Sequence, residues 1–107
     1  MSEGDAGTEP HDDERWLVIK GRRWRRIDPC LPEDLVAALK SHLGTGRSTV
    51  GAAKRSGDDD RVLAARRRVG LAKLGLGERG PYWWERPESE RIEQAETALR
   101  DLAALAE

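Results

Sequence analysis

Residues 53–60, AKRSGDDD, contain the break that decides the fold of this chain. Lys54 and Arg55 suit the negative end of a helix dipole. Gly57 permits a left-handed C-terminal cap, and Asp58 is a favoured N-cap for a new helix. Because the connection is so short, the two flanking helices are predicted to fold back on each other as an antiparallel hairpin.

Apolar residues recur at helical spacing on both sides of this break. The first stripe, on a helix predicted over about residues 32–55, consists of Leu35, Leu39, Leu43, Gly46, Val50 and Ala53. The second stripe, on a helix predicted over about residues 59–74, consists of Val62, Ala65, Val69 and Ala72. Glycines inside the first helix each cost about 1 kcal/mol relative to Ala, so its continuity through Gly44–Gly46 stays open.

A further helical stripe follows near the C-terminal end of the sequence and predicts a helix over about residues 88–106. Residues 15–27, RWLVIKGRRWRRI, instead predict a β-hairpin, because a strand-favouring run precedes the turn residues Lys20-Gly21. The predicted fold is therefore mainly α: an antiparallel helix hairpin plus a C-terminal helix, with a small N-terminal β-hairpin.

The predicted hairpin brings tryptophans and arginines close together. We expect a return strand over about residues 22–27. Trp16, Val18 and Trp24 are expected to share one face, which packs on the helices. The other face is then expected to carry Arg23 and Arg25.

Residues 1–14, MSEGDAGTEPHDDE, carry six acids and no Lys or Arg, and they are predicted to form a disordered acidic tail. Residues 15–107 are predicted to form a single small domain. With Cys30 as the one cysteine, no intrachain disulfide can form, and a reducing cytoplasm is the expected location. The apolar runs are too short to predict a membrane span.

No catalytic, cofactor-binding or metal-binding residues are predicted, and we expect a protein that is not an enzyme. The sequence Gly75–Gly80 matches G-x-G-x-x-G, but it follows a helix and runs into Pro81, so it predicts a helix stop and a turn. The histidines His11 and His42 and the thiol of Cys30 lack the spacing of metal ligands or of a nucleophile with its base.

Basic residues are concentrated where the acidic tail ends. Residues 15–31 hold six bases and one acid, a net charge of +5. Arginines neutralise phosphates and an aromatic ring can stack on a base, so nucleic-acid or other polyanion binding is the first functional hypothesis. Its predicted residues are Lys20, Arg22, Arg23, Arg25, Arg26, Arg66, Arg67 and Arg68. Three alternatives stay open: Trp24 belongs to the core, the arginines pair with acids of the last helix, or the acidic tail covers them.

The adjacent tryptophans Trp83 and Trp84 support a second hypothesis. Two neighbouring tryptophans seldom both become buried, and exposed Trp is enriched in binding hot spots. The loop that carries them, together with the last helix, is therefore a candidate surface for a protein partner, and self-association stays open. The alternative is that both rings close the edge of a small core that lacks Phe.

Three segments resemble a known family. They are Trp16–Pro29 (WLVIKGRRWRRIDP), the step AKRSGD at Ala53–Asp58, and the run LGERGPYWWE at Leu76–Glu85. Together they resemble a family of short uncharacterised bacterial proteins often labelled "biopolymer transporter Tol". The resemblance implies no catalytic residues. The chain departs from the family pattern at Gly44–Thr49, which bears on the continuity of the first helix.

Overall fold

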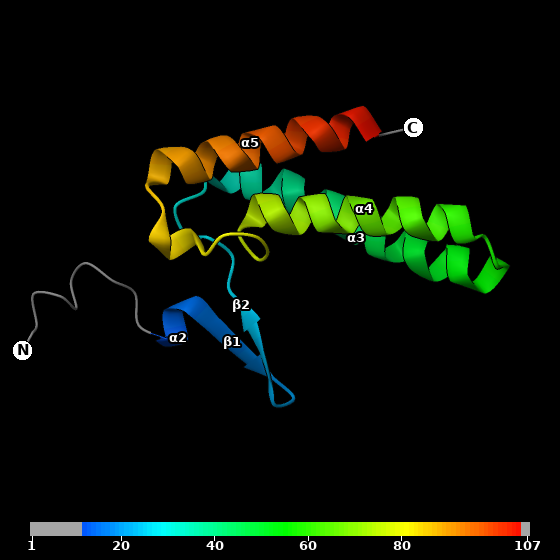
Figure 1. Ribbon diagram of the computed structural model, residues 1–107, viewed down its shortest axis with the longest axis horizontal. Coiled ribbons are helices and arrows are strands. Elements are labelled where there is room, and N and C mark those ends of the chain that lie inside the picture. Colours follow the sequence, from blue (N-terminus) through cyan, green and yellow to red (C-terminus); the bar gives the residue numbers. More distant parts are fainter. Residues whose placement is uncertain (1–11, 106–107) are drawn as a thin grey trace, which may run out of the picture.

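The structure is a computed structural model that describes residues 12–105. Its elements, in chain order, are α2 (Asp12–Arg15), β1 (Trp16–Ile19), β2 (Arg22–Arg25), α3 (Glu33–Ser56), α4 (Asp59–Leu76), the 3-10 turn η1 (Trp83–Glu85) and α5 (Glu88–Leu105). The mainly helical fold with a small N-terminal hairpin is confirmed (Figure 1).

Helices α3 and α4 form the predicted antiparallel pair. Gly57 caps α3 in the left-handed conformation, and its backbone N–H reaches the carbonyl of Lys54. Asp58 caps α4 by accepting a hydrogen bond from the backbone N–H of Arg61 at 3.1 Å. At the other end of α4, Gly77 is again left-handed, with φ of 84°. The glycine-rich segment is thus a helix stop, as its context predicted.

Helix α5 packs against the pair at one end, and the other end of the α3–α4 hairpin extends beyond it (Figure 1). All three helices contribute to one apolar core, whose buried members are Leu31, Leu35, Leu39, Leu43, Ala72, Leu76, Ala95, Ala98 and Leu102. The core therefore lies at the end of the molecule from which the β-hairpin projects.

Helix α3 is continuous through Gly44–Gly46, which settles the open question. A Cβ at Gly46 would lie 2.8 Å from Cγ2 of Val69 and 3.3 Å from the carbonyl oxygen of Ala65. The missing side chain lets α4 approach closely, so interhelical packing compensates for the poor helix propensity.

The β-hairpin forms with Lys20 and Gly21, both at positive φ, in its turn. Its two-residue loop pairs Trp16 with Arg25 and Leu17 with Trp24. The predicted faces are therefore wrong, because directly paired residues share a face. One face carries Trp16, Val18, Arg23 and Arg25, and the other carries Leu17, Ile19, Arg22 and Trp24. We call the first the packed face and the second the open face.

The boundary of the predicted tail is also corrected. Residues 12–14 belong to α2, which leads directly into β1. Arg26 holds α2 in place. Its Nε donates to the carbonyl of Asp13 at 2.7 Å, and its backbone N–H donates to the carbonyl of Arg15 at 2.7 Å. The rest of the predicted tail, residues 1–11, lies outside the described residues.

A buried ion pair fixes the segment between the hairpin and α3. Asp28 is 2% exposed and receives two hydrogen bonds from Arg91 of α5, from Nη2 at 2.6 Å and from Nε at 2.9 Å. Its backbone N–H donates to the carbonyl of Leu76 at 2.9 Å. Burial alone would raise the pKa of Asp28, but the hydrogen bonds from Arg91 and the Cys30 amide hold it below its usual value.

Candidate functional site

The packed face of the hairpin lies against the loop before α5 at its Trp16 and Arg25 end, whereas Val18 on the same face is 65% exposed. Trp16 meets Tyr82 and Trp84 edge-on, with ring centroids 6.2 and 5.7 Å apart, while Tyr82 and Trp84 stack at 4.7 Å. The guanidinium of Arg23 covers Trp16 at 4.4 Å from its centroid. This aromatic cluster joins segments more than sixty residues apart in the sequence.

Arg25 is the polar centre of this contact. Its Nη1 lies within hydrogen-bond distance of three backbone carbonyls, those of Gly77 at 3.2 Å, Gly80 at 3.0 Å and Pro81 at 3.2 Å. The same guanidinium lies 4.6 Å from the centre of the Tyr82 ring. Arg25 was predicted to bind a polyanion, but its donors are directed at the protein's own loop. Its role in the structure is to hold the hairpin in place.

The two adjacent tryptophans have different environments. Trp83 is only 5% exposed, and its Nε1 donates to the carbonyl of Arg26 at 3.0 Å. Its burial removes it from the predicted pair of partner-contacting residues. Trp84 is half-buried in the aromatic cluster, whereas Tyr82 is exposed. Any partner of this loop would therefore meet Tyr82 and the accessible part of Trp84.

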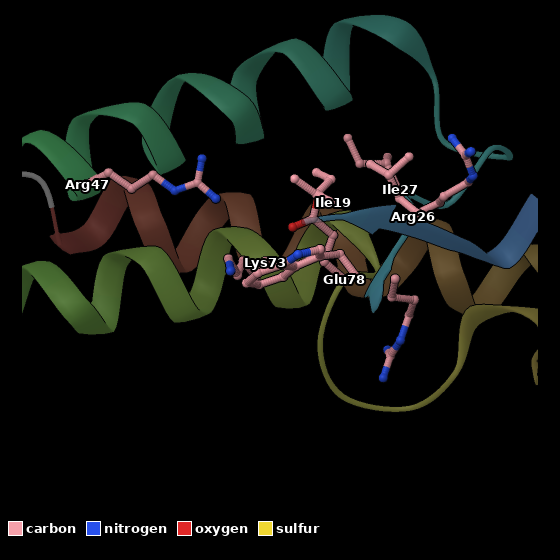
Figure 2. A pocket seen from close by; sticks show the side chains of 9 residues that line it. Ile19, Arg26, Ile27, Arg47, Lys73 and Glu78 are labelled. Carbon is pink, nitrogen blue, oxygen red and sulfur yellow. The ribbon is translucent and has the colours of Figure 1, made fainter. Parts of the chain in front are cut away.

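The open face borders a hollow of about 570 Å³ between the hairpin and the helix pair. Its apolar wall comes from Leu17, Ile19, Trp24 and Ile27, and its charged lining comes from Arg25, Arg26, Arg47, Lys73 and Glu78. Arg47 comes from α3 and Lys73 from α4, and Figure 2 shows Arg47 extending toward Ile19 of the hairpin. The lining therefore holds four cationic residues and a single acid.

Trp24 is the aromatic member of this wall. It is 39% exposed, and two cations contact its ring: the guanidinium of Arg22 at 4.8 Å and the ammonium of Lys73 at 5.5 Å from the centroid. Ile19, next to it in the wall, is 49% exposed. Apolar and cationic groups thus lie side by side on a surface that the fold leaves accessible.

Positive charges crowd around Lys73. Burial, followed by the charges of Arg79 and Arg47, lowers the pKa of Lys73, while Glu78 acts in the opposite direction. An anion placed among these groups would relieve their mutual repulsion. The electrostatics of the hollow therefore favour a negatively charged ligand.

The remaining residues of the predicted basic set are distributed over several surfaces. Lys20 is exposed at the hairpin turn. Arg66 and Arg67 are exposed on α4, and Arg66 lies seven residues before Lys73, on the same helix face and about 10 Å away. Arg68 contacts Nδ1 of His42 at 2.9 Å. Because Arg can only donate, this histidine nitrogen accepts and Arg68 is committed to the α3–α4 contact.

Sequence reasoning missed Arg47 and Lys73 as members of the site. Each directly follows a buried residue of an apolar stripe, Gly46 on α3 and Ala72 on α4. Such a position at the edge of a stripe was the available signal, because it places a long basic side chain beside the packing interface.

Cys30 and His42 have separate environments in the structure. Burial, with the hydrogen bond and negative charge of Asp28, raises the pKa of Cys30 to about 11, so this thiol stays protonated at neutral pH and is a poor nucleophile. His42 is engaged with Arg68 rather than with Cys30. Within residues 12–105, no group of three His, Cys, Asp or Glu residues is arranged to hold a metal ion.

Comparisons with protein-family models, with curated proteins and with solved structures found no match for this chain. The resemblance to the family labelled "biopolymer transporter Tol" therefore stays a prediction. In the part of the chain that the structure describes, every helix is too short or too polar to cross a membrane.

Proposed function

We propose that this protein is a non-enzymatic module that binds polyanions, nucleic acids above all, through the open face of its β-hairpin. The observation that carries the proposal is the hollow lined by Trp24, Lys73 and Arg47, in which Lys73 contacts the Trp24 ring. Arg22 of the hairpin also covers this ring. Binding in a cytoplasmic setting is part of the proposal, since one lone cysteine fits a reducing compartment.

The chemistry of the lining supports a polyanion over a neutral ligand. Arg and Lys neutralise phosphates and release the counterions that surround them, which makes affinity strongly dependent on salt. The net charge of the whole chain is only −1, so attraction must come from local clustering rather than from a basic protein as a whole.

The test is a titration with mixed single-stranded and duplex nucleic acid, followed by tryptophan fluorescence at low and then physiological salt. We expect a saturable change that weakens steeply with salt. The substitution Arg22→Gln should weaken binding and reduce the salt slope by about 1, the loss of one phosphate contact. Arg100→Gln, which removes the same charge from the exposed side of α5, is the matched control. No binding at low salt would refute the proposal.

A second candidate function is docking of a protein partner on the loop of Tyr82 and Trp84 together with α5. Tyr82 is exposed and stacked on Trp84, which makes a rigid aromatic surface beside that helix. This candidate predicts partner capture or self-association that tolerates salt and is lost in Tyr82→Ala. The polyanion proposal predicts that the same variant still binds nucleic acid.

A further inference from the structure

The hollow beside the open face has two chemically different sides. The hairpin supplies an apolar wall that includes an indole, and the helices supply Arg47 and Lys73. Its volume of about 570 Å³ lies within the usual range for small-molecule sites. A ligand that fits both sides must combine a flat, weakly polar ring with an anionic group. A polyanion without rings would use the cations and leave the apolar wall in water.

We infer that the ligand is single-stranded nucleic acid, and that an unpaired base enters the hollow and stacks on Trp24 while the adjoining phosphates meet Arg47 and Lys73. This inference rests on the proposed function and deepens it by naming the class of nucleic acid and the subsite for the base.

The present contacts of Trp24 can be exchanged for such a base. Its ring is covered by the ends of two flexible side chains, those of Arg22 and Lys73. Stacking of a base on an aromatic ring is stronger than an exposed cation–π contact. A displaced ammonium would find a phosphate within reach, so Lys73 loses a weak contact and gains a charge-assisted one.

A duplex satisfies these features poorly. Its bases are paired and stacked, so only phosphates could approach the hollow. A free two-stranded ribbon could enter a major groove, but here the end of the packed face at Trp16 is covered by Tyr82 and Trp84. The open face borders the hollow opposite the two helices. A single strand can turn one base out toward Trp24 and keep its backbone along the basic rim.

The experiment compares three labelled ligands of equal length on the full chain, by fluorescence anisotropy at low salt: a thymine-only single strand, the same strand with abasic sites throughout, and a duplex. We expect the thymine strand to bind about 5- to 150-fold more tightly than the abasic strand, the gain that base stacking provides. The duplex has a higher charge density than either single strand, but its bases cannot reach Trp24, so its affinity should not depend on that ring.

Substitutions locate the effect. Trp24→Leu keeps an apolar wall without an aromatic face and should remove the preference for the thymine strand, while Trp24→Phe should retain most of it. Lys73→Gln should lower the affinity for all three ligands, because it removes a phosphate contact. Its matched control, Lys54→Gln, changes the same residue type at the far end of α3 and should leave binding unchanged. Thermal unfolding of each variant checks that the fold is intact.

The outcomes separate the two proposals. Equal, salt-dependent affinity for all three ligands would overturn the stacking inference and leave polyanion binding in place. A thymine preference that survives in Trp24→Leu would also overturn it, since the base would then be bound elsewhere. Absence of binding by every ligand at low salt would overturn both proposals. A preference that depends on Trp24 would support both.

Discussion

The two faces of the β-hairpin use the same kinds of residue for different purposes. On the packed face, Arg23 covers Trp16 at 4.4 Å, and on the open face, Arg22 covers Trp24 at 4.8 Å. Trp16 also meets the rings of the loop before α5, whereas Trp24 borders a hollow. A Trp–Arg pair is therefore structural or available to a ligand according to what the fold places opposite it.

The comparison suggests that one face contributes to stability and the other to ligand binding, and measurements of unfolding and of binding can distinguish the two contributions. The packed face should contribute to the free energy of unfolding and little to ligand binding. The open face should behave in the opposite way, because Trp24 and its neighbours border the hollow rather than the loop before α5. The ion pair between Asp28 and Arg91 supports both faces, since it fixes the chain where it leaves the hairpin.

The largest effect is expected from Arg91→Met, which would disrupt both faces together. The change leaves the carboxylate of Asp28 buried without its cation, and removing one partner of a buried pair costs about 3–5 kcal/mol. Urea unfolding followed by far-UV circular dichroism measures this loss. In the control Arg100→Met, the lost side chain contacts Thr97 on the exposed side of α5, so the change should stay within about 0.5 kcal/mol. Equal unfolding midpoints would show that the pair does not anchor the hairpin.

A smaller effect should distinguish one face from the other. Arg25→Met on the packed face removes the charged donor shared by three carbonyls, and we expect a loss of about 2 kcal/mol in unfolding free energy. Arg22→Met on the open face should change it by no more than about 0.5 kcal/mol. Both variants are measured by urea unfolding with tryptophan fluorescence. Similar losses in the two variants would mean that the open face is also needed for folding.

Local signals in the sequence were sufficient to predict most of the fold. The cap residues Gly57 and Asp58 and the apolar stripes identify α3 and α4, because these signals act within a few residues. The hairpin faces were also predictable but were assigned wrongly, because they follow from the register that the predicted turn sets. A two-residue turn at Lys20-Gly21 places Leu17, not Trp16, opposite Trp24.

The candidate site was predictable only in part, because it is assembled from distant segments. The hairpin arginines were visible as a basic cluster, yet the same cluster contains Arg25, which binds carbonyls from residues 77–81. Arg47 and Lys73 join the hollow only because the hairpin docks beside them. That docking depends on long-range contacts such as the hydrogen bond from Trp83 to the carbonyl of Arg26.

The smallest expected effect is a decrease in the free energy of unfolding at acidic pH. It tests the ion pair between Asp28 and Arg91, which supports both faces of the hairpin. The pKa of Asp28 is lower in the folded chain than in the unfolded chain, because Arg91 and the Cys30 amide stabilise the carboxylate. Its contribution to stability is therefore complete above the unfolded value of about 3.9 and is lost as the pH falls through the lower folded value. The free energy of unfolding should thus decrease below about pH 4.

Other carboxylates titrate in the same range, so the measurement must be a difference. Unfolding free energies from about pH 6 to about pH 2 are compared between the natural chain and Asp28→Asn, which cannot ionise at this position. The variant should be less stable at neutral pH, and the gap between the two profiles should narrow as the pH falls, because protonation removes the charge that the variant already lacks. Parallel profiles would mean that Asp28 has the same pKa in both states, and the ion pair would then contribute packing but no net charge stabilisation to the anchor of the two faces.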